Sequence, residues 1–228
     1  MKKTKSIIAL MAISMVLFSC GNKSGEKKTE QKDSIATTTE KKPEVNPNEV
    51  KIGNQTWAVK NLNVSTFSNG DPIPEAKTVK EFEAAGNKGK PMSYFSKNDP
   101  VNGDKYGKIY NWYAATDPRG IAPKGWHVPS EGEWNELINF LGGEDEAAKK
   151  IMSASVEGGG NSSGFSAIET PDIQGTLGDN GDVYYLRWWT TSEQSKNNGQ
   201  TSFIQNHRSI ITSWLRKENG IFIRCIKD

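Results

Sequence analysis

The sequence predicts an α+β fold, in which short helices and twisted antiparallel sheets are joined by long loops. Two observations support this class. Helix signals lie in the first half of residues 49–228, and strand-like runs with turn-rich connections fill the last part. This segment holds all seven tryptophans and has the size of one domain. We expect two or three short helices in it.

Residues 1–19 have the features of a signal peptide. Lys2, Lys3 and Lys5 form a basic head, and the run SIIALMAISMVLF is apolar but too short to span a membrane. The run ends in LFSC, which resembles the lipobox of bacterial lipoproteins. That resemblance implies that Cys20 is acylated, becomes the new N-terminus and anchors the chain to a lipid bilayer of the bacterial cell envelope, with the outer membrane expected. An ordinary signal peptide with a chance cysteine is the alternative, and the leaflet stays open.

Residues 20–48 predict a disordered tether behind that anchor. After Cys20 they contain no aromatic residue and only two β-branched aliphatic residues, Ile35 and Val45, which are too few to bury a core. A flexible coil of this length spans about 30 Å on average. Without residues 1–19 the chain carries 26 basic and 27 acidic side chains. No basic patch remains that would indicate nucleic-acid binding.

The domain at 49–228 opens with a predicted β-hairpin. The segment VKIGNQTWAVKNL has two short apolar runs around Gly53 and Asn54, which is the signal of a two-residue turn. Because side chains alternate along a strand, Ile52, Trp57 and Val59 are expected to point inward.

The next two segments differ in how clearly they predict structure. TVKEFEAAG predicts a short helix, since Thr78 and Glu81 have the spacing of a capping box and Gly86 is a stop signal. The pattern of YGKIYNWYAA, residues 106–115, fits a strand or a helix equally well.

The stretch GWHVPSEGEW, residues 125–134, contains the side chains of a hydrolase or metal site but predicts a helix start. Ser130 and Glu133 have capping-box spacing, and from Trp134 onward apolar residues recur at i, i+3, i+4 and i+7 until Gly142. The pattern predicts a helix over 131–141 without any catalytic role.

Catalytic alternatives fit this stretch less well. A nucleophile elbow needs glycine two residues before the serine, where Val128 stands. Pro129 lies between His127 and Glu131, so that pair straddles the helix start, and two histidines are few for a zinc site. The residues expected to be structural are Trp126, His127, Ser130, Glu133 and Trp134, with His127 partly buried.

Later segments predict one more helix and a set of strands. EDEAAKKIMSAS has the pattern of a short helix, and a long loop rich in glycine, asparagine and serine follows it. Strands are predicted for VYYLRWWTT (183–191), TSFIQ (201–205), SIITSWL (209–215) and GIFIRCI (220–226).

Several pieces of the chain together resemble the Fibrobacter succinogenes major paralogous domain. They are IGNQTWAVKNLN, YGKIYNWYAA, APKGWHVPSEGEWNEL, GFSAI, YYLRWWTTSE and GIFIRCIKD, and they follow the order of the family from about residue 50 to the last residue. The resemblance implies a C-type-lectin-like fold. It implies no activity, because the family has no agreed function and no assigned catalytic residues.

The resemblance also bears on the second cysteine. Family members often carry a cysteine before the P-x-G-W-H run, apparently as the partner of the cysteine in the final strand, and here Ala122 stands at that position. With Cys20 acylated, Cys225 is therefore expected to be an unpaired, buried thiol that packs as a small hydrophobic residue.

A lectin-like fold raises the question of a calcium site. The tripeptides Glu-Pro-Asn, Gln-Pro-Asp and Trp-Asn-Asp of such sites do not occur in the chain. Asp179 and Asp182 share a tight loop and are weak cation candidates, but Asp-Asn-Gly is ordinary turn chemistry. We expect neither a metal site nor a cofactor.

Aromatic side chains suggest glycan binding without calcium. On a strand over 183–191, Tyr185, Arg187 and Trp189 share one face, which we expect to be the more solvated one. The next loop adds amides. The candidate ligand-binding residues are Tyr185, Arg187, Trp189, Asn197 and Asn198, and the alternative is that the tryptophans belong to the core.

These observations predict an envelope-anchored lipoprotein whose domain binds a protein or glycan ligand, through a loop surface within 158–200. No carboxylate pair of an acid/base site is recognisable, so we expect no enzymatic activity. The alternative is a carbohydrate-active or protein-modifying enzyme whose carboxylates meet only in the folded chain.

Overall fold

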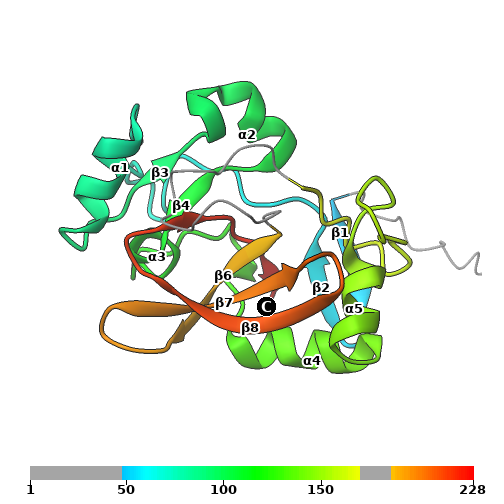
Figure 1. The fold of residues 1–228 in the computed structure, drawn as a ribbon. Coiled ribbons are helices and arrows are strands. Elements are labelled where there is room, and N and C mark those ends of the chain that lie inside the picture. The colour runs from blue at the N-terminus through cyan, green and yellow to red at the C-terminus, as the bar shows by residue number, and fades with distance from the viewer. Residues whose placement is uncertain (1–47, 170–185) are drawn as a thin grey trace, which may run out of the picture. The chain divides into compact units, whose positions relative to one another are not determined.

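The computed structural model describes residues 48–169 and 186–228. Within these residues the chain is an α+β domain with five α-helices and three small antiparallel sheets (Figure 1). The predicted α+β class is confirmed, but the expectation of two or three helices was too low. The two further helices have seven and four residues, too short to show an apolar period, and the shorter one lies in the segment 106–115 that fits a strand or a helix equally well.

The first sheet joins the two ends of the domain. Its strands are β1 (Glu49–Ile52), β2 (Gln55–Ala58), β10 (Ile226–Lys227) and β5 (Trp126–His127), in the order β1-β2-β10-β5. The predicted hairpin is confirmed, because Ile52 pairs with Gln55 across the two-residue turn. Gly53 has a φ of 61°, which side chains other than glycine rarely adopt, and this explains why glycine occupies the turn.

A second sheet lies with the helices of the first half. It consists of β3 (Ser93–Tyr94), β4 (Ile109–Asn111) and β9 (Gly220–Ile221) and is accompanied by α1 (Val79–Gly86), a 3₁₀ turn (Ser96–Asn98), α2 (Pro100–Tyr106) and α3 (Trp112–Ala115). Helix α1 begins at the predicted cap, where the Thr78 side chain accepts a hydrogen bond from the Glu81 N–H. The ambiguous segment 106–115 contains both elements, strand β4 and then helix α3, whose cap is Asn111.

Helices α4 (Glu131–Leu141) and α5 (Glu144–Ile151) follow. The bounds of α4 are the predicted ones. Its capping box is complete, and Gly142 ends the helix with a φ of 104°. Helix α5 buries Ala147, Ala148 and Ile151, as its pattern predicts.

The third sheet has the order β6-β7-β8, with β6 (Arg187–Glu193), β7 (Asn198–Gln205) and β8 (Ser209–Arg216). Strands at 201–205 and 209–215 are thus confirmed, whereas 220–226 is not one strand. Between β9 and β10 the backbone carbonyls of Phe222, Ile223 and Cys225 accept hydrogen bonds from the N–H groups of Trp189, Leu62 and Ala58. These donors belong to two separate segments of the domain, so the chain here does not pair in a single ladder.

An aromatic cluster holds these layers together. The ring of Trp134 lies 4.8 Å from that of Trp57, 5.3 Å from that of Trp188 and 5.7 Å from that of Phe165. All four side chains are buried. The cluster therefore fixes α4 between the hairpin and the third sheet.

Candidate functional site

An open groove lies between the β1–β2 hairpin and the outer face of α4. We call it the α4 groove. Its volume is about 490 Å³, which is in the range of small-ligand sites. Its lining residues are Ile52, Asn54, Gln55, Gly132, Asn135, Glu136, Asn139 and Phe140.

The two walls of the groove are tied to each other. The Gln55 amide donates to the Glu133 carbonyl at 2.9 Å and accepts from the Trp57 indole N–H at 3.0 Å. The Phe140 ring lies directly over Gly53, because a Cβ at that glycine would come within 2.9 Å of the ring. The hairpin therefore sets the position of the ring.

The lining combines an exposed aromatic ring with amides. Phe140 is 63% exposed, although it is a large hydrophobic residue. The side chains of Asn54, Asn135 and Asn139 are also exposed. Amides both donate and accept hydrogen bonds, whereas the ring offers a flat apolar face. Together they fit a ligand that has one apolar face and many hydroxyl groups.

The groove carries negative rather than positive charge. Helix α4 contains three glutamates and neither lysine nor arginine, and no basic residue lines the groove. Glu136 is the one carboxylate among the lining residues. Glu133 is turned to other partners, since its carboxylate accepts from Ser130 and contacts His127.

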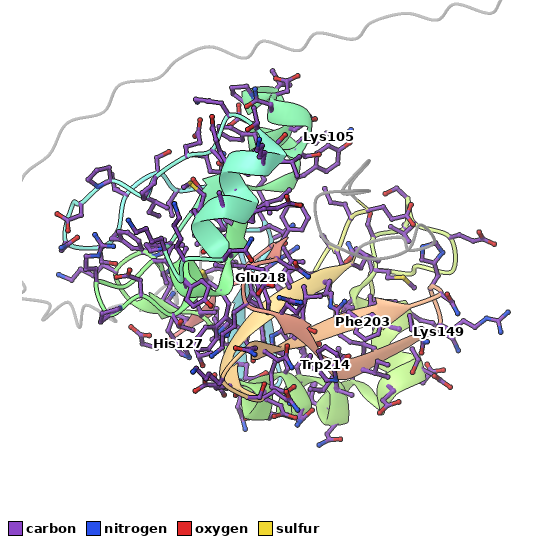
Figure 2. The ribbon with its side chains drawn as sticks, turned by 60° about the vertical axis from the view of Figure 1, so that its left-hand side comes forward. Lys105, His127, Lys149, Phe203, Trp214 and Glu218 are labelled. Atoms are coloured by element: carbon purple, nitrogen blue, oxygen red, sulfur yellow. The ribbon has the colours of Figure 1, made fainter. Side chains whose placement is uncertain are left out.

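A second open hollow, of about 410 Å³, lies beside β5 and is lined by Ser68, Thr191 and residues from within 115–128. His127, which is labelled in Figure 2, is one of the residues that line this hollow. The imidazole Nδ1 lies 2.8 Å from Asp228 Oδ1 and Nε2 lies 2.7 Å from Glu133 Oε1. We call this arrangement the His127 clasp.

The clasp is a structural arrangement. Partial burial opposes the charged ring, but the hydrogen bonds to Glu133 and Asp228 outweigh it and raise the pKa of His127 above its usual value. Burial likewise opposes ionised Glu133, and hydrogen bonds from Ser130 and His127 nevertheless lower its pKa. Because carboxylates occupy both ring nitrogens, neither nitrogen is open to a substrate in the hollow. His127 is partly buried, as the sequence predicts.

The predicted solvated face of β6 is wrong for Trp189. Its side chain is fully buried, and its indole N–H donates to the Tyr110 carbonyl of β4 at 2.8 Å. Strand β4 covers this end of the sheet, and the sequence pattern gives no sign of that cover. Arg187 remains partly exposed, but its guanidinium lies 4.7 Å from the Phe203 ring centre and donates to Thr201 at 3.0 Å.

The other predicted ligand-binding residues do not line the α4 groove or lie outside the described residues. Asn197 is exposed and Asn198 half-buried, and neither lines the α4 groove. Tyr185, Asp179 and Asp182 lie outside the described residues, as do Cys20 and almost all of the tether. Within 48–169 and 186–228 there is no group of three or more His, Cys, Asp or Glu side chains that could hold a metal ion. No helix in those ranges is both long and apolar enough to cross a bilayer.

The other residues expected to be structural lie in capping or packed positions. The Ser130 and Glu133 side chains form the capping box, and Trp134 is buried. Trp126 is half-buried, with the Lys227 ammonium 5.6 Å from its ring centre. Cys225 is free and buried, and burial raises the pKa of its thiol to about 12, which makes it a poor nucleophile.

The groove itself was not predicted. Phe140 is not part of the apolar series of α4, which consists of Trp134, Leu137, Ile138 and Leu141. An aromatic residue outside the apolar stripe of a helix is expected to be exposed, and this was the one signal in the sequence that pointed to the groove. The facing wall comes from the hairpin, and Gln55 is 78 residues away from its partner Glu133. No local pattern indicates such a pairing.

Comparison with known proteins identifies the family. The family model described as the Fibrobacter succinogenes major domain matches residues 50–227, which is well over half of the chain. Comparisons with curated proteins and with solved structures found no match. The chain belongs to the Fibrobacter succinogenes major domain family.

Proposed function

We propose that this chain is a lipoprotein anchored through Cys20 in the bacterial cell envelope, at the outer membrane, and that its C-type-lectin-like domain binds glycans without catalysis. The family resemblance and the α+β architecture support the finer fold assignment. The lipobox-like LFSC sequence supports the anchor, because acyl chains gain about 0.8 kcal/mol for each methylene group that they bury.

Phe140 is the observation that carries the proposed ligand class. A ring that is 63% exposed loses the stabilisation of burial, and here it is held over Gly53 rather than packed inside. A sugar ring presents an apolar C–H face that stacks on such a surface. Its hydroxyl groups match the neighbouring amides of Asn135 and Asn139.

The composition of the groove supports binding without catalysis or calcium. Glycosidases use two carboxyl groups that flank the scissile bond, and Glu136 is the single carboxylate that lines the α4 groove. Calcium takes six to eight oxygen ligands, with several carboxylates among them. One carboxylate and three asparagines are a weak set for that ion.

The test is a polysaccharide array probed with residues 20–228 in which Cys20→Ser prevents acylation. We expect saturable binding to one class of glycan, unchanged by a calcium chelator. Phe140→Ala should weaken that binding by about tenfold or more, as loss of a central aromatic contact does.

Val101→Ala is the matched control. Val101 is a large exposed hydrophobic residue too, 71% exposed, but it belongs to α2, which lies on the opposite side of the domain from α4 (Figures 1 and 2). We expect this variant to bind as the unsubstituted chain does. If no glycan binds, or if both variants bind equally well, the proposal is wrong.

A further inference from the structure

We propose that the glycan site continues from Phe140 along α4 to Trp214, and that it takes an extended, uncharged glycan chain rather than a single terminal sugar. This inference rests on the proposed glycan-binding function and deepens it. It starts from exposure: within 48–169 and 186–228 the large exposed hydrophobic residues are Val101, Phe140 and Trp214, and Trp214 is 53% exposed.

Strand β8 passes beside α4 at one edge of the groove, and it carries Trp214. Thr212 and Trp214 are two residues apart on β8, so their side chains point to the same face of the sheet. Thr212 Oγ1 lies 3.5 Å from Asn135 Oδ1, and Asn135 lines the groove. One asparagine of α4 therefore lies between the groove and the strand that carries Trp214. Figure 2 labels Trp214 on the strand beside α4.

The contacts along β8 show that it runs antiparallel to α4. Ser209, at the start of β8, contacts Glu144, which follows the end of α4. At the other end Trp214 pairs with Gln200, whose carbonyl accepts from Thr190. Two residues beyond Thr190, the Ser192 hydroxyl accepts from the Glu131 N–H, the first residue of α4. Trp214 thus lies toward the start of α4 and Phe140 toward its end.

The two rings are far enough apart to require a chain of sugars. From Asn135 to Phe140 is five helical residues, about 7.5 Å along the axis. From Thr212 to Trp214 is two strand residues, about 6.7 Å in the opposite direction. The sum of about 14 Å, counted along the direction of the helix axis alone, exceeds one sugar ring, and along that direction Asn135 and Asn139 lie between the two rings.

The charges along this path favour an uncharged glycan. Glu131 and Glu136 belong to the outer part of α4, which has no basic residue, and an acidic polysaccharide would be repelled. Arg216, next along β8 on the Trp214 face, is paired with Glu218. Among the described residues no lysine or arginine lines the α4 groove. Arg187 donates to the Trp214 carbonyl at 3.0 Å, but its side chain is on the opposite face of the sheet from that of Trp214.

Isothermal titration of residues 20–228 carrying Cys20→Ser tests the proposal with length series of cello-, manno- and chito-oligosaccharides, from monosaccharide to hexasaccharide. Hexagalacturonate serves as the acidic chain of matched length. We expect affinity to rise with length and then level off, and hexagalacturonate to bind at least about tenfold more weakly than the best neutral hexasaccharide.

Three variants separate the extended-site proposal from the general proposal of glycan binding. Trp214→Ala should lower the affinity for the hexasaccharide by about tenfold and leave the disaccharide unchanged, whereas Phe140→Ala should weaken both. Trp214→Phe keeps a ring and should keep most of the gain with length. Urea denaturation of each variant confirms that it is folded.

The possible results distinguish the extended neutral site from the more general proposal of glycan binding. The extended neutral site is overturned by any of three results: affinity that is independent of chain length, hexasaccharide binding that Trp214→Ala does not change, or a preference for hexagalacturonate. In each case the proposed glycan-binding function survives if Phe140→Ala still weakens binding. Binding of no glycan, either in the three sugar series or on the polysaccharide array, overturns both. Binding of oligolysine with no glycan binding would show instead that the acidic face of α4 docks a basic partner.

Discussion

Among single residues, Arg224 shows most directly how the ends of the domain are joined. Its guanidinium is fully buried, donates to the carbonyls of Ala58, Val59 and Phe165 at 2.5–3.0 Å, and donates to Asn61 at 3.0 Å. Burial lowers the pKa of Arg224 to about 9. A charged group thus bonds the last part of the chain to two segments that are distant in sequence.

Arg224→Met should lower the free energy of unfolding by at least about 2 kcal/mol at pH 7, because it leaves several shielded carbonyls without a donor at about 1–3 kcal/mol each. Urea denaturation measures this loss. Arg224→Lys should recover only part of it, since one ammonium group cannot span the same acceptors. A methionine variant as stable as the unsubstituted chain would show that relief from burying a charge offsets the lost hydrogen bonds.

The His127 clasp predicts a pH dependence of stability. Because the pKa of His127 is higher in the folded chain than its ordinary 6.5, the protonated ring stabilises the fold fully below about pH 6.5, and this contribution is lost as pH rises through the raised value. Glu133 acts in the opposite sense, since its lowered pKa makes its contribution disappear as pH falls below the ordinary 4.5. The clasp is strongest between these limits.

We therefore expect His127→Gln to destabilise the chain most near pH 5–6, by about 1 kcal/mol or less because the ring is 40% exposed. The difference should shrink above the raised pKa. Urea midpoints measured from pH 4.5 to 9 give the profile, and Asp228→Asn, which removes one of the two carboxylates, should reproduce part of it. A difference that does not change with pH would contradict an ionic clasp.

At the level of secondary-structure elements, the start of α4 positions both the core and the groove. The Ser130 hydroxyl accepts from the Glu133 N–H, and the Glu133 carboxylate accepts from the Ser130 N–H at 2.7 Å. Ser130→Ala should lower the free energy of unfolding by about 1 kcal/mol, with an unchanged urea m-value. Ser130→Thr keeps the hydroxyl and should be nearly neutral, and an equal loss in both variants would exclude the cap as the cause.

Elements with local signals were predictable from the sequence. The hairpin at 49–58 and helix α4 each carry their turn or cap residues within a few positions, and both form as predicted. Helix α2 was missed, although Asp99 and Pro100 are a good start signal, because Gly103 interrupts its short run.

Features made by tertiary packing were not predictable. Alternation correctly placed Trp189 and Arg187 on one face of β6, but β4 covers one end of that face and leaves the other partly open. The α4 groove likewise needs the hairpin and α4 to meet, which depends on the Gln55 contact and the buried tryptophan cluster. Local sequence patterns do not reveal such long-range pairings.

For the whole molecule, the two cysteines are expected to differ in chemical modification. Cys225 is buried, and its thiol pKa is raised to about 12, so it is protected from modification. Cys20 follows the signal-like run and is the proposed acylation site. Because both cysteines are in one chain, a substitution of Cys225 is the control for a substitution of Cys20 in tests of acylation.

Cys20→Ser in the full chain should abolish labelling by an alkyne fatty acid and move the protein from the outer-membrane fraction to the soluble fraction, because the acyl chains then no longer bury their methylene groups in the bilayer. Cys225→Ala should leave both the label and the fractionation unchanged, since a small apolar residue fills the same buried position. The acidic face of α4 offers no electrostatic attraction to anionic lipids that would replace the anchor. A Cys20→Ser chain that still sediments with the outer membrane would show that a partner of the domain, and not the lipid, holds this protein at the envelope.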